Sequence, residues 1–581
     1  MTTPESSPSE SASVRTINRA VPDDWALRPW LIASLLGIAG LAVHLASDGG
    51  EDVPWRMALT ALCFFAPFAA AFTIDRDFRI PPVIFSLGVG LVMAGIAWRA
   101  TNAGDRYSDE AYWIASGILA ITLAVPLFQA GFHRKRMATS YADTHYFVWT
   151  DVISGAGSFA FLGLSWALIA ILSELFQLIK IDLLKDLLNE QWFGWIFSGV
   201  AFGAALGTLR NQLKILATLQ SVVLLVLSLL AVPLAAALVI FLLAMAVSGP
   251  DVLWEATRSA TPVLLAIAVG AFILTNAVIR DQDAGTSGSR VLRIAALILA
   301  LGIFPLTVFA AVSMGTRIAQ HGLSPERIWA LIAIAVATAY GFAYLAGVVR
   351  GRKNGWRDNL RQSNLHLAVI VAVLALLLAM PILNFGAIST GNQLARLESG
   401  AVSAKDFDYS ALRWDFGEPG REALVKLAKS DSAEISKGAK IAQTEEYRRY
   451  RSFEEPQDES DKRMANLRME FDDPALRERV ELTVAAMRWT CDDPCVALDA
   501  GETGGLHLIL LVEGQNVRQI TVDPAKPLDE MGGPAEAAEL YPAYDAADKP
   551  KDVTAKSKVE IREWRGRKIF VDGKPVGEPF E

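Results

Sequence analysis

Residues 213–247 read LKILATLQSVVLLVLSLLAVPLAAALVIFLLAMAV, and the interpretation of this run decides the fold. The run carries a single charge, on Lys214, and is longer than the roughly 20 apolar residues that cross a bilayer as one helix. Pro233 near its middle leaves two interpretations, one tilted helix kinked at the proline or two short helices. We predict one helix, because a second crossing here would invert the charge bias of every later loop.

The rest of the chain has the composition of a membrane protein. Of its 581 residues, 52% are hydrophobic and 20% are charged, and the apolar residues gather in further runs that are nearly free of charge. Together with residues 213–247, these runs predict a bundle of about eleven transmembrane helices. The predicted helices cover residues 30–46, 57–74, 81–98, 112–132, 152–178, 192–209, 213–247, 261–279, 291–312, 328–349 and 365–385.

Lysine and arginine residues are concentrated in alternate loops of this predicted bundle. Short loops rich in these residues stay in the cytoplasm. The N-terminus is therefore predicted to be cytoplasmic, and the part after the last helix to lie in the periplasm of a bacterial inner membrane. The basic set comprises Arg15, Arg19, Arg28, Arg76, Arg79, Arg134, Lys135, Arg136, Arg210, Lys214, Arg280, Arg290, Arg293, Arg350, Arg352, Lys353, Arg357 and Arg361.

Three parts follow from this pattern. Residues 1–24 are rich in Ser, Pro, Glu and Thr and are predicted to form a disordered cytoplasmic tail. Residues 25–385 are predicted to form an all-α, polytopic transmembrane domain. Residues 386–581 are predicted to form an extracytoplasmic α+β domain. Within the last part the sequence predicts the following elements: helices at 421–429 and 474–488, a hairpin joining 506–512 to 517–522, a hairpin joining 559–564 to 568–571, and loops at 454–461 and 523–551.

Charge and motifs exclude several classes of partner. From Gly391 onward the net charge is roughly −10, which opposes binding to nucleic acid. The chain contains neither a phosphate-binding glycine loop nor a dinucleotide fingerprint, and its six histidines lack the spacing of metal ligands. We therefore expect no cofactor, no metal, no catalytic residue and no nucleic acid. The expected partners are the lipid bilayer and a periplasmic protein or small ligand.

Glu174 is the acidic residue that we place inside a predicted transmembrane run. Because a buried carboxylate in a membrane is costly, such groups often mark an ion or proton pathway. Glu174 lies near one end of its helix, however, so a position at the lipid headgroups explains it better than a polar pathway does. His44, Asn276 and His366 are further candidates for an intramembrane polar site.

Gly199, Gly203 and Gly207 recur every four residues in the predicted helix 192–209. Small residues at this spacing leave a groove that a second helix can enter closely. The sequence leaves open whether that helix belongs to the same chain or to a second copy. Either way, helix 192–209 is predicted to be central.

Cys491 and Cys495 bracket the turn-forming sequence Asp492-Asp493-Pro494. In an oxidising compartment such a turn favours a disulfide, and the alternatives are free thiols or a metal site.

The segment after the last predicted helix carries a likeness to a known family. It runs from Ile388-Ser389-Thr390-Gly391-Asn392-Gln393-Leu394-Ala395-Arg396-Leu397 through Phe407-Asp408-Tyr409 to Leu412-Arg413-Trp414-Asp415-Phe416-Gly417-Glu418-Pro419-Gly420-Arg421-Glu422-Ala423-Leu424. This segment resembles the bacterial membrane-protein family known as domain of unknown function 4153. The resemblance implies the architecture from about residue 25 to 428 and no activity. Locally, Gly417-Glu418-Pro419-Gly420 predicts a tight turn that leads into a helix.

Three classes of function remain. A non-enzymatic envelope protein that presents a periplasmic domain to a partner or ligand accounts best for the missing catalytic motifs. A carrier or lipid-handling permease accounts for the many helices, and an enzyme acting on a lipid-linked substrate is the third class. The fold by itself does not rank them.

Overall fold

The computed structural model describes the chain from residue 25 onward, and residues 1–24, the predicted tail, lie outside the described residues. The chain divides into two compact units, Met1–Arg448 and Arg449–Glu581. The sequence places the end of the membrane domain earlier, at residue 385. The described ranges are 25–50, 52–76, 80–108, 110–249, 260–351, 355–380, 382–445, 448, 463–487, 490–503, 506–514, 516–522, 538–540, 557–563, 567–571 and 573–580.

Within the described residues, eleven helices are long and apolar enough to cross a membrane, so the chain is a multi-pass membrane protein. Residues 213–247 form one continuous helix that contains Pro233, as predicted. The eleven helices are α2 (Arg28–Ser47), α3 (Pro54–Thr73), α4 (Ile80–Ala103), α5 (Glu110–Gln129), α7 (Tyr141–Leu178), α9 (Gln191–Asn211), α10 (Leu213–Ser248), α12 (Ala260–Ile279), α13 (Arg290–His321), α14 (Pro325–Gly351) and α15 (Trp356–Ala379).

Three of these helices differ most from their predicted limits. Helix α7 begins at Tyr141 rather than at residue 152, α13 continues to His321 rather than to residue 312, and α15 spans Trp356–Ala379 rather than 365–385. Their extra turns are polar, and apolar runs alone do not reveal them. At the start of α7, Ser140 caps the helix by accepting a hydrogen bond from the Asp143 amide.

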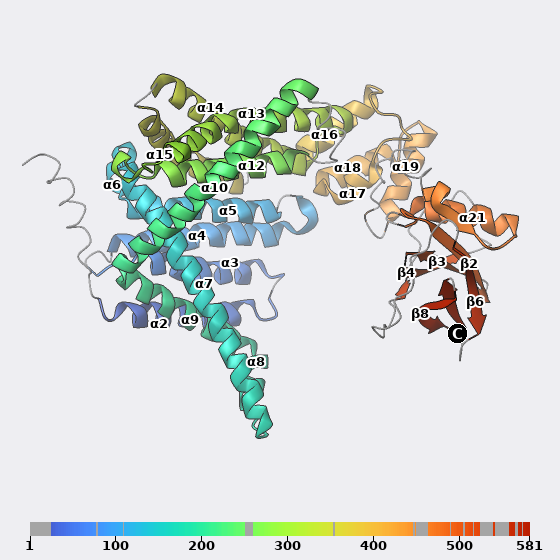
Figure 1. The fold of residues 1–581 in the computed structure, drawn as a ribbon, viewed down its shortest axis with the longest axis horizontal. Coiled ribbons are helices and arrows are strands. Elements are labelled where there is room, and N and C mark those ends of the chain that lie inside the picture. Colours follow the sequence, from blue (N-terminus) through green and yellow to red (C-terminus); the bar gives the residue numbers. More distant parts are fainter. Residues whose placement is uncertain are drawn as a thin grey trace, which may run out of the picture. The chain divides into compact units, whose positions relative to one another are not determined.

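The membrane helices form two groups. Helices α2, α3, α4 and α9 pack together, α12 to α15 pack together, and α5 joins the groups through α4 and α15. Helices α7 and α10 cross the others obliquely (Figure 1). We call the end at which α2 begins the N-terminal end and the other the opposite end. Short helices α6 (Phe132–Lys135) and α8 (Leu183–Asn189) follow α5 and α7.

The three glycines of α9 lie against α2 of the same chain. A Cβ atom at Gly203 would stand 2.6 Å from the Ile32 carbonyl oxygen, and one at Gly207 would stand 2.5 Å from Pro29 Cα. A Cβ atom at Gly199 would meet the Leu36 carbonyl oxygen. The groove formed by the three glycines is therefore filled by the backbone of α2 in the same chain. A larger residue at these positions would have to displace that backbone, which is energetically costly.

Four helices after α15 belong to the first unit. Helices α16 (Phe385–Glu398), α17 (Tyr409–Trp414), α18 (Gly417–Leu427) and α19 (Ala433–Thr444) enclose a small core around Leu412, Phe416 and Leu424. Helix α16 contacts α14, and α18 contacts the 3₁₀ turn Gly104–Arg106 after α4. These helices therefore extend the membrane unit beyond the last span.

The second unit confirms the predicted α+β class. Its main sheet has the order β1-β2-β3-β4-β5, with β1 parallel to β2 and the other pairs antiparallel, and β6-β7-β8 form a second sheet. Both predicted hairpins are present, as β3–β4 and β6–β7. The elements are β1 (Leu467–Met469), α21 (Pro474–Ala486), β2 (Cys495–Thr503), β3 (Leu506–Glu513), β4 (Asn516–Val522), β5 (Ala538–Leu540), β6 (Val559–Glu563), β7 (Arg567–Val571) and β8 (Lys574–Phe580).

Alternate residues of the main sheet face two cores. Ile509 and Leu511 of β3 pack with Val480 of α21, whereas Leu510 and Val512 pack with β7. Strand β5 falls within residues 523–551, so the prediction of a loop is wrong there. Residues 454–461 and the rest of 523–551 lie outside the described residues.

Candidate ligand site in the helical bundle

The four predicted intramembrane polar residues lie on four different helices. Glu174 is exposed on the last turns of α7, and His44 on α2 and His366 on α15 are half-buried. Asn276, on α12, is the buried one. The structure does not bring the four together into one site.

Asn276 belongs to a buried hydrogen-bond network that joins α7, α12, α14 and α15. Its Nδ2 donates to the Tyr344 hydroxyl at 2.7 Å, and that hydroxyl donates to Asn364 Oδ1 at 2.9 Å. Asn364 Nδ2 donates back to Asn276 Oδ1 at 2.7 Å. Tyr141 contacts both amides at 3.4 Å. Because the members satisfy one another, the network stabilises a helix junction.

Arg361 closes the N-terminal end beside this network. Its guanidinium donates to the Ile279 and Arg280 carbonyls at the end of α12 and to the Asp283 and Asp358 carboxylates. Arg357 also binds Asp283. Burial alone would raise the pKa of Asp283, but the hydrogen bonds from Arg361 and Arg357 outweigh it and hold that pKa below its ordinary value.

A cavity of about 810 Å³ lies between α5, α12, α14 and α15, with one residue from α13. Its volume falls within the roughly 300–1,000 Å³ of ordinary ligand sites. Most of its lining is aliphatic, including Ala268, Ala333 and Leu374. Phe272 and Tyr340 line its deep end, with their rings 5.1 Å apart, and stand between the cavity and the Asn276 network.

Polar side chains gather where the cavity meets the opposite end of the bundle. Tyr112 of α5 and Glu326 and Trp329 of α14 line the cavity there, in the first turns of their helices. The Tyr112 and Trp329 rings stack at 5.0 Å, and Phe385 of α16 packs edge-on against Trp329 at 5.1 Å. Glu326 is exposed and is the one charged residue among the described lining residues.

Trp329 contributes a hydrogen-bond donor without a partner. Its Nε1 atom is buried and has no hydrogen-bond partner among the described residues. An indole N–H usually finds an acceptor when it is buried. Within the described part of the chain, the site therefore combines a mostly aliphatic pocket with one carboxylate and one unpartnered N–H donor at the same end.

Asp151, on α7, is an intramembrane acid that the sequence analysis missed. Its Oδ1 accepts a hydrogen bond from Gln129 Nε2 at 3.1 Å, and its Oδ2 is buried without a partner in the described structure. The prediction missed it because the apolar run begins at Val152, one residue later. The capping pattern Ser140-x-x-Asp143 could have signalled the earlier start of α7.

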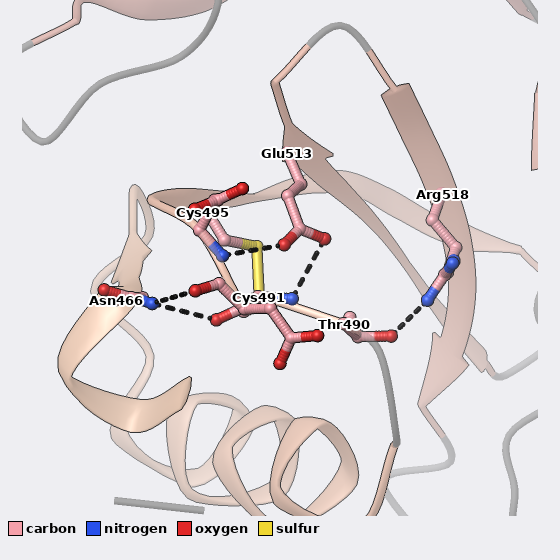
Figure 2. The surroundings of a disulfide bond; sticks show 8 residues. Asn466, Thr490, Cys491, Cys495, Glu513 and Arg518 are labelled. Carbon is pink, nitrogen blue, oxygen red and sulfur yellow. Dashed lines mark hydrogen bonds between the residues drawn. A yellow bond between two sulfur atoms is a disulfide. The ribbon is translucent and has the colours of Figure 1, made fainter. Parts of the chain in front are cut away.

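The predicted disulfide partners are joined in the second unit. Cys491 and Cys495 form a buried disulfide with a Cα–Cα distance of 5.0 Å. Figure 2 shows Glu513 accepting from the Cys491 amide, and it also accepts from the Asp493 amide, each at 3.0 Å. Asn466 donates to the Cys491 and Asp492 carbonyls. The disulfide thus belongs to a turn that the surrounding residues hold in place.

The residues that carry the family resemblance have structural partners. Gln393 and Arg396 of α16 bind the end of α13, where Arg396 donates to the Ala319 and Gln320 carbonyls and Gln393 to the His321 carbonyl, and Asn392 accepts from the Leu323 amide just after it. These carbonyls lack partners within α13. The sequence predicts a turn at residues 417–420 before a helix at 421–429, whereas helix α18 itself begins at Gly417, whose φ is 67°.

Comparison with known proteins gives one match. The family model described as "Domain of unknown function (DUF4153)" matches residues 20–427. No curated protein and no solved structure matches the chain. Among the described residues, no group of three or more His, Cys, Asp or Glu side chains is arranged to hold a metal ion.

Proposed function

Because the chain belongs to the family described as "Domain of unknown function (DUF4153)", whose description carries no activity, we propose a function from the geometry of its cavity. The protein binds the hydrocarbon chain of an amphiphilic lipid between α5, α12, α14 and α15, with the lipid headgroup at Glu326 and Trp329. This is the lipid-handling alternative of the sequence analysis. The single observation that carries the proposal is the mostly aliphatic cavity that, among the described residues, has its one charged residue, Glu326, and the unpartnered Trp329 N–H group at the same end.

The shape of the cavity supports a chain-like ligand. Its lining extends along α14 from Glu326 to Tyr340, which is roughly 20 Å at the rise of an α-helix. Over most of this length the lining offers only methyl and methylene groups. A polar ligand placed there would lose its hydrogen bonds to water without replacing them.

Selectivity must come from the mouth of the cavity. A lipid chain that moves from the bilayer into an aliphatic cavity gains little from the hydrophobic effect, because both surroundings are apolar. The Glu326 carboxylate accepts hydrogen bonds, and the Trp329 Nε1 group donates one. A headgroup with both an amine or hydroxyl donor and an acceptor oxygen matches this pair.

Filling the cavity tests the proposal. We expect Ala333→Trp, which places an indole in the cavity, to reduce the lipid that remains bound on gentle detergent extraction at least several-fold, as measured by native mass spectrometry. Ala335→Trp is the matched control, because Ala335 is an exposed residue of the same helix outside the lining. Equal lipid occupancy in the two variants and the wild type would refute the lipid site.

For the orientation, we propose that the N-terminal end faces the cytoplasm of a bacterial inner membrane and that the second unit is periplasmic. The bias of lysine and arginine toward alternate loops supports this proposal. Eleven membrane helices, an odd number, are consistent with the two chain ends lying on opposite sides. In this orientation the headgroup end of the cavity faces the periplasmic leaflet.

A further inference from the structure

A second polar site lies near the N-terminal end of the bundle, around Asp151. Gln129 Nε2 donates both to Asp151 Oδ1 and to the Phe72 carbonyl, at 3.1 and 2.8 Å. Arg210 of α9 donates to the Ala71 carbonyl at 2.6 Å. Asp151 and Arg210 are therefore both tied to the last turn of α3, Asp151 through Gln129.

The charge of Asp151 is incompletely compensated. No ion pair or hydrogen bond joins the Asp151 and Arg210 side chains in the described structure, and Asp151 Oδ2 and Gln129 Oε1 are buried without partners. A carboxylate with one bare oxygen in such surroundings is costly, and a bound proton removes most of that cost.

The other charged groups around Asp151 are engaged elsewhere or are less close. Arg28 of α2 pairs with Asp75 at 2.6 Å and also donates to the Arg210 carbonyl and Asn211. His145 lies on the same helix as Asp151, six residues earlier, and its Nε2 is buried without a partner. Arg210 is thus the cation placed to balance Asp151 when it is ionised.

We infer that Asp151 is a proton-binding site within the membrane bundle, with Gln129 as the residue that positions its carboxylate and Arg210 as the compensating cation. The step is an acid–base equilibrium: the O–H bond at Oδ2 forms with a proton from a hydronium ion, which becomes water, and it breaks when water accepts the proton and becomes hydronium again. The inference is independent of the proposed lipid site. It supplies the titratable membrane group that a proton-coupled carrier needs.

A carbodiimide probe tests this inference. Dicyclohexylcarbodiimide partitions into membranes and modifies protonated carboxyl groups, so we expect an adduct at Asp151 in the full-length protein in lipid nanodiscs. The adduct, quantified by peptide mass spectrometry, should fall about tenfold per pH unit above the midpoint of titration. Glu174→Gln, which removes an exposed carboxyl group from the same helix, should leave the Asp151 adduct unchanged.

The substitution Gln129→Leu tests whether Gln129 positions the Asp151 carboxylate or only supports the fold. Loss of the N–H donor to the ionised form favours the protonated form, so the labelling profile should move to higher pH. An Asp151 adduct absent at every pH, or constant with pH, would overturn the inference. Protection of Asp151 by sodium ions at constant pH would also overturn it, because the site would then hold a metal cation. The pH dependence of the Asp151 adduct and the sodium test are both measured on the wild-type protein, so they remain valid even if the Gln129→Leu variant fails to fold.

Discussion

Asp283 lies in the loop between α12 and α13 and accepts hydrogen bonds from Arg357 and Arg361, each at 2.9 Å. Its pKa is lower in the folded protein than in an unfolded chain. Such a group contributes stability above its unfolded pKa of about 4, and this contribution is lost as the pH falls through the folded pKa. Because the Asp283 side chain is about half exposed, we take the contribution as below about 1 kcal/mol.

The acid response of the purified protein checks this prediction. We expect the unfolding temperature to fall on acidification below about pH 4, and Asp283→Asn to remove part of that fall. Asp186→Asn, on exposed α8, is the control and should retain the full acid response. Identical acid profiles for Asp283→Asn and the wild type would contradict the role assigned to this carboxylate.

The disulfide is the second residue-scale test. In a Cys63→Ala background, which removes the third thiol, we expect an alkylating reagent to label Cys491 and Cys495 only after denaturation and reduction. Replacing both by serine should lower the free energy of unfolding of the second unit by about 2 kcal/mol, because the closed loop is short. Labelling of both cysteines in denatured, unreduced protein from cells would show that the bond does not form there.

At the scale of elements, the contact between α2 and α9 depends on the absence of side chains. We expect Gly203→Leu to reduce the yield of monodisperse protein and its unfolding temperature strongly, because the new side chain meets the backbone of α2. Gly163→Leu, on α7, is the matched control, since a Cβ atom there has no neighbour within 4 Å. Both variants are compared by size-exclusion chromatography and thermal unfolding, and equal behaviour would contradict the close approach.

The membrane helices are the elements that the sequence predicts best. Each of the eleven predicted runs contains most of one observed helix, because an apolar run of this length has no other stable form in a bilayer. Their ends are predicted less well, and the polar first turns of α7 conceal Asp151. Helices α16, α17 and α19 were not predicted, because they are short and their small core forms only when they pack together.

The cavity lies beyond any prediction from a single sequence. The cavity is lined by Ala268, Ala333 and Leu374, which are the same residue types that face lipid elsewhere. The space between them arises only from the packing of four helices. By contrast, the sequence shows Asn276 to be a polar residue within a membrane run, although its partners Tyr141, Tyr344 and Asn364 could not be identified from the sequence.

At the scale of the whole molecule, the proposed orientation makes a prediction about every loop. Reporter fusions after Arg136, Lys214, Arg293 and Lys353 should report the cytoplasm, and fusions after Glu51, Asp105 and Ser430 the periplasm. The fusion after Lys214 and the fusion after Arg293 bracket α10 and α12, so agreement between them also tests the single crossing of α10. A cytoplasmic result at Ser430, which follows the last membrane helix, would contradict the model of eleven membrane crossings.

The contact between α2 and α9 also determines when α2 can pack during synthesis of the chain. Ile32 and Gly203 lie in contact although most of the N-terminal half of the membrane unit separates them along the sequence. Ribosomes add roughly 5–20 residues per second. The first helix to leave the ribosome therefore waits roughly ten to thirty seconds for its main neighbour. During that interval the nascent chain holds α2 to α5 and α7 in the bilayer without α9, and the insertion machinery or lipid must cover the backbone strip of α2 that the three glycines later occupy.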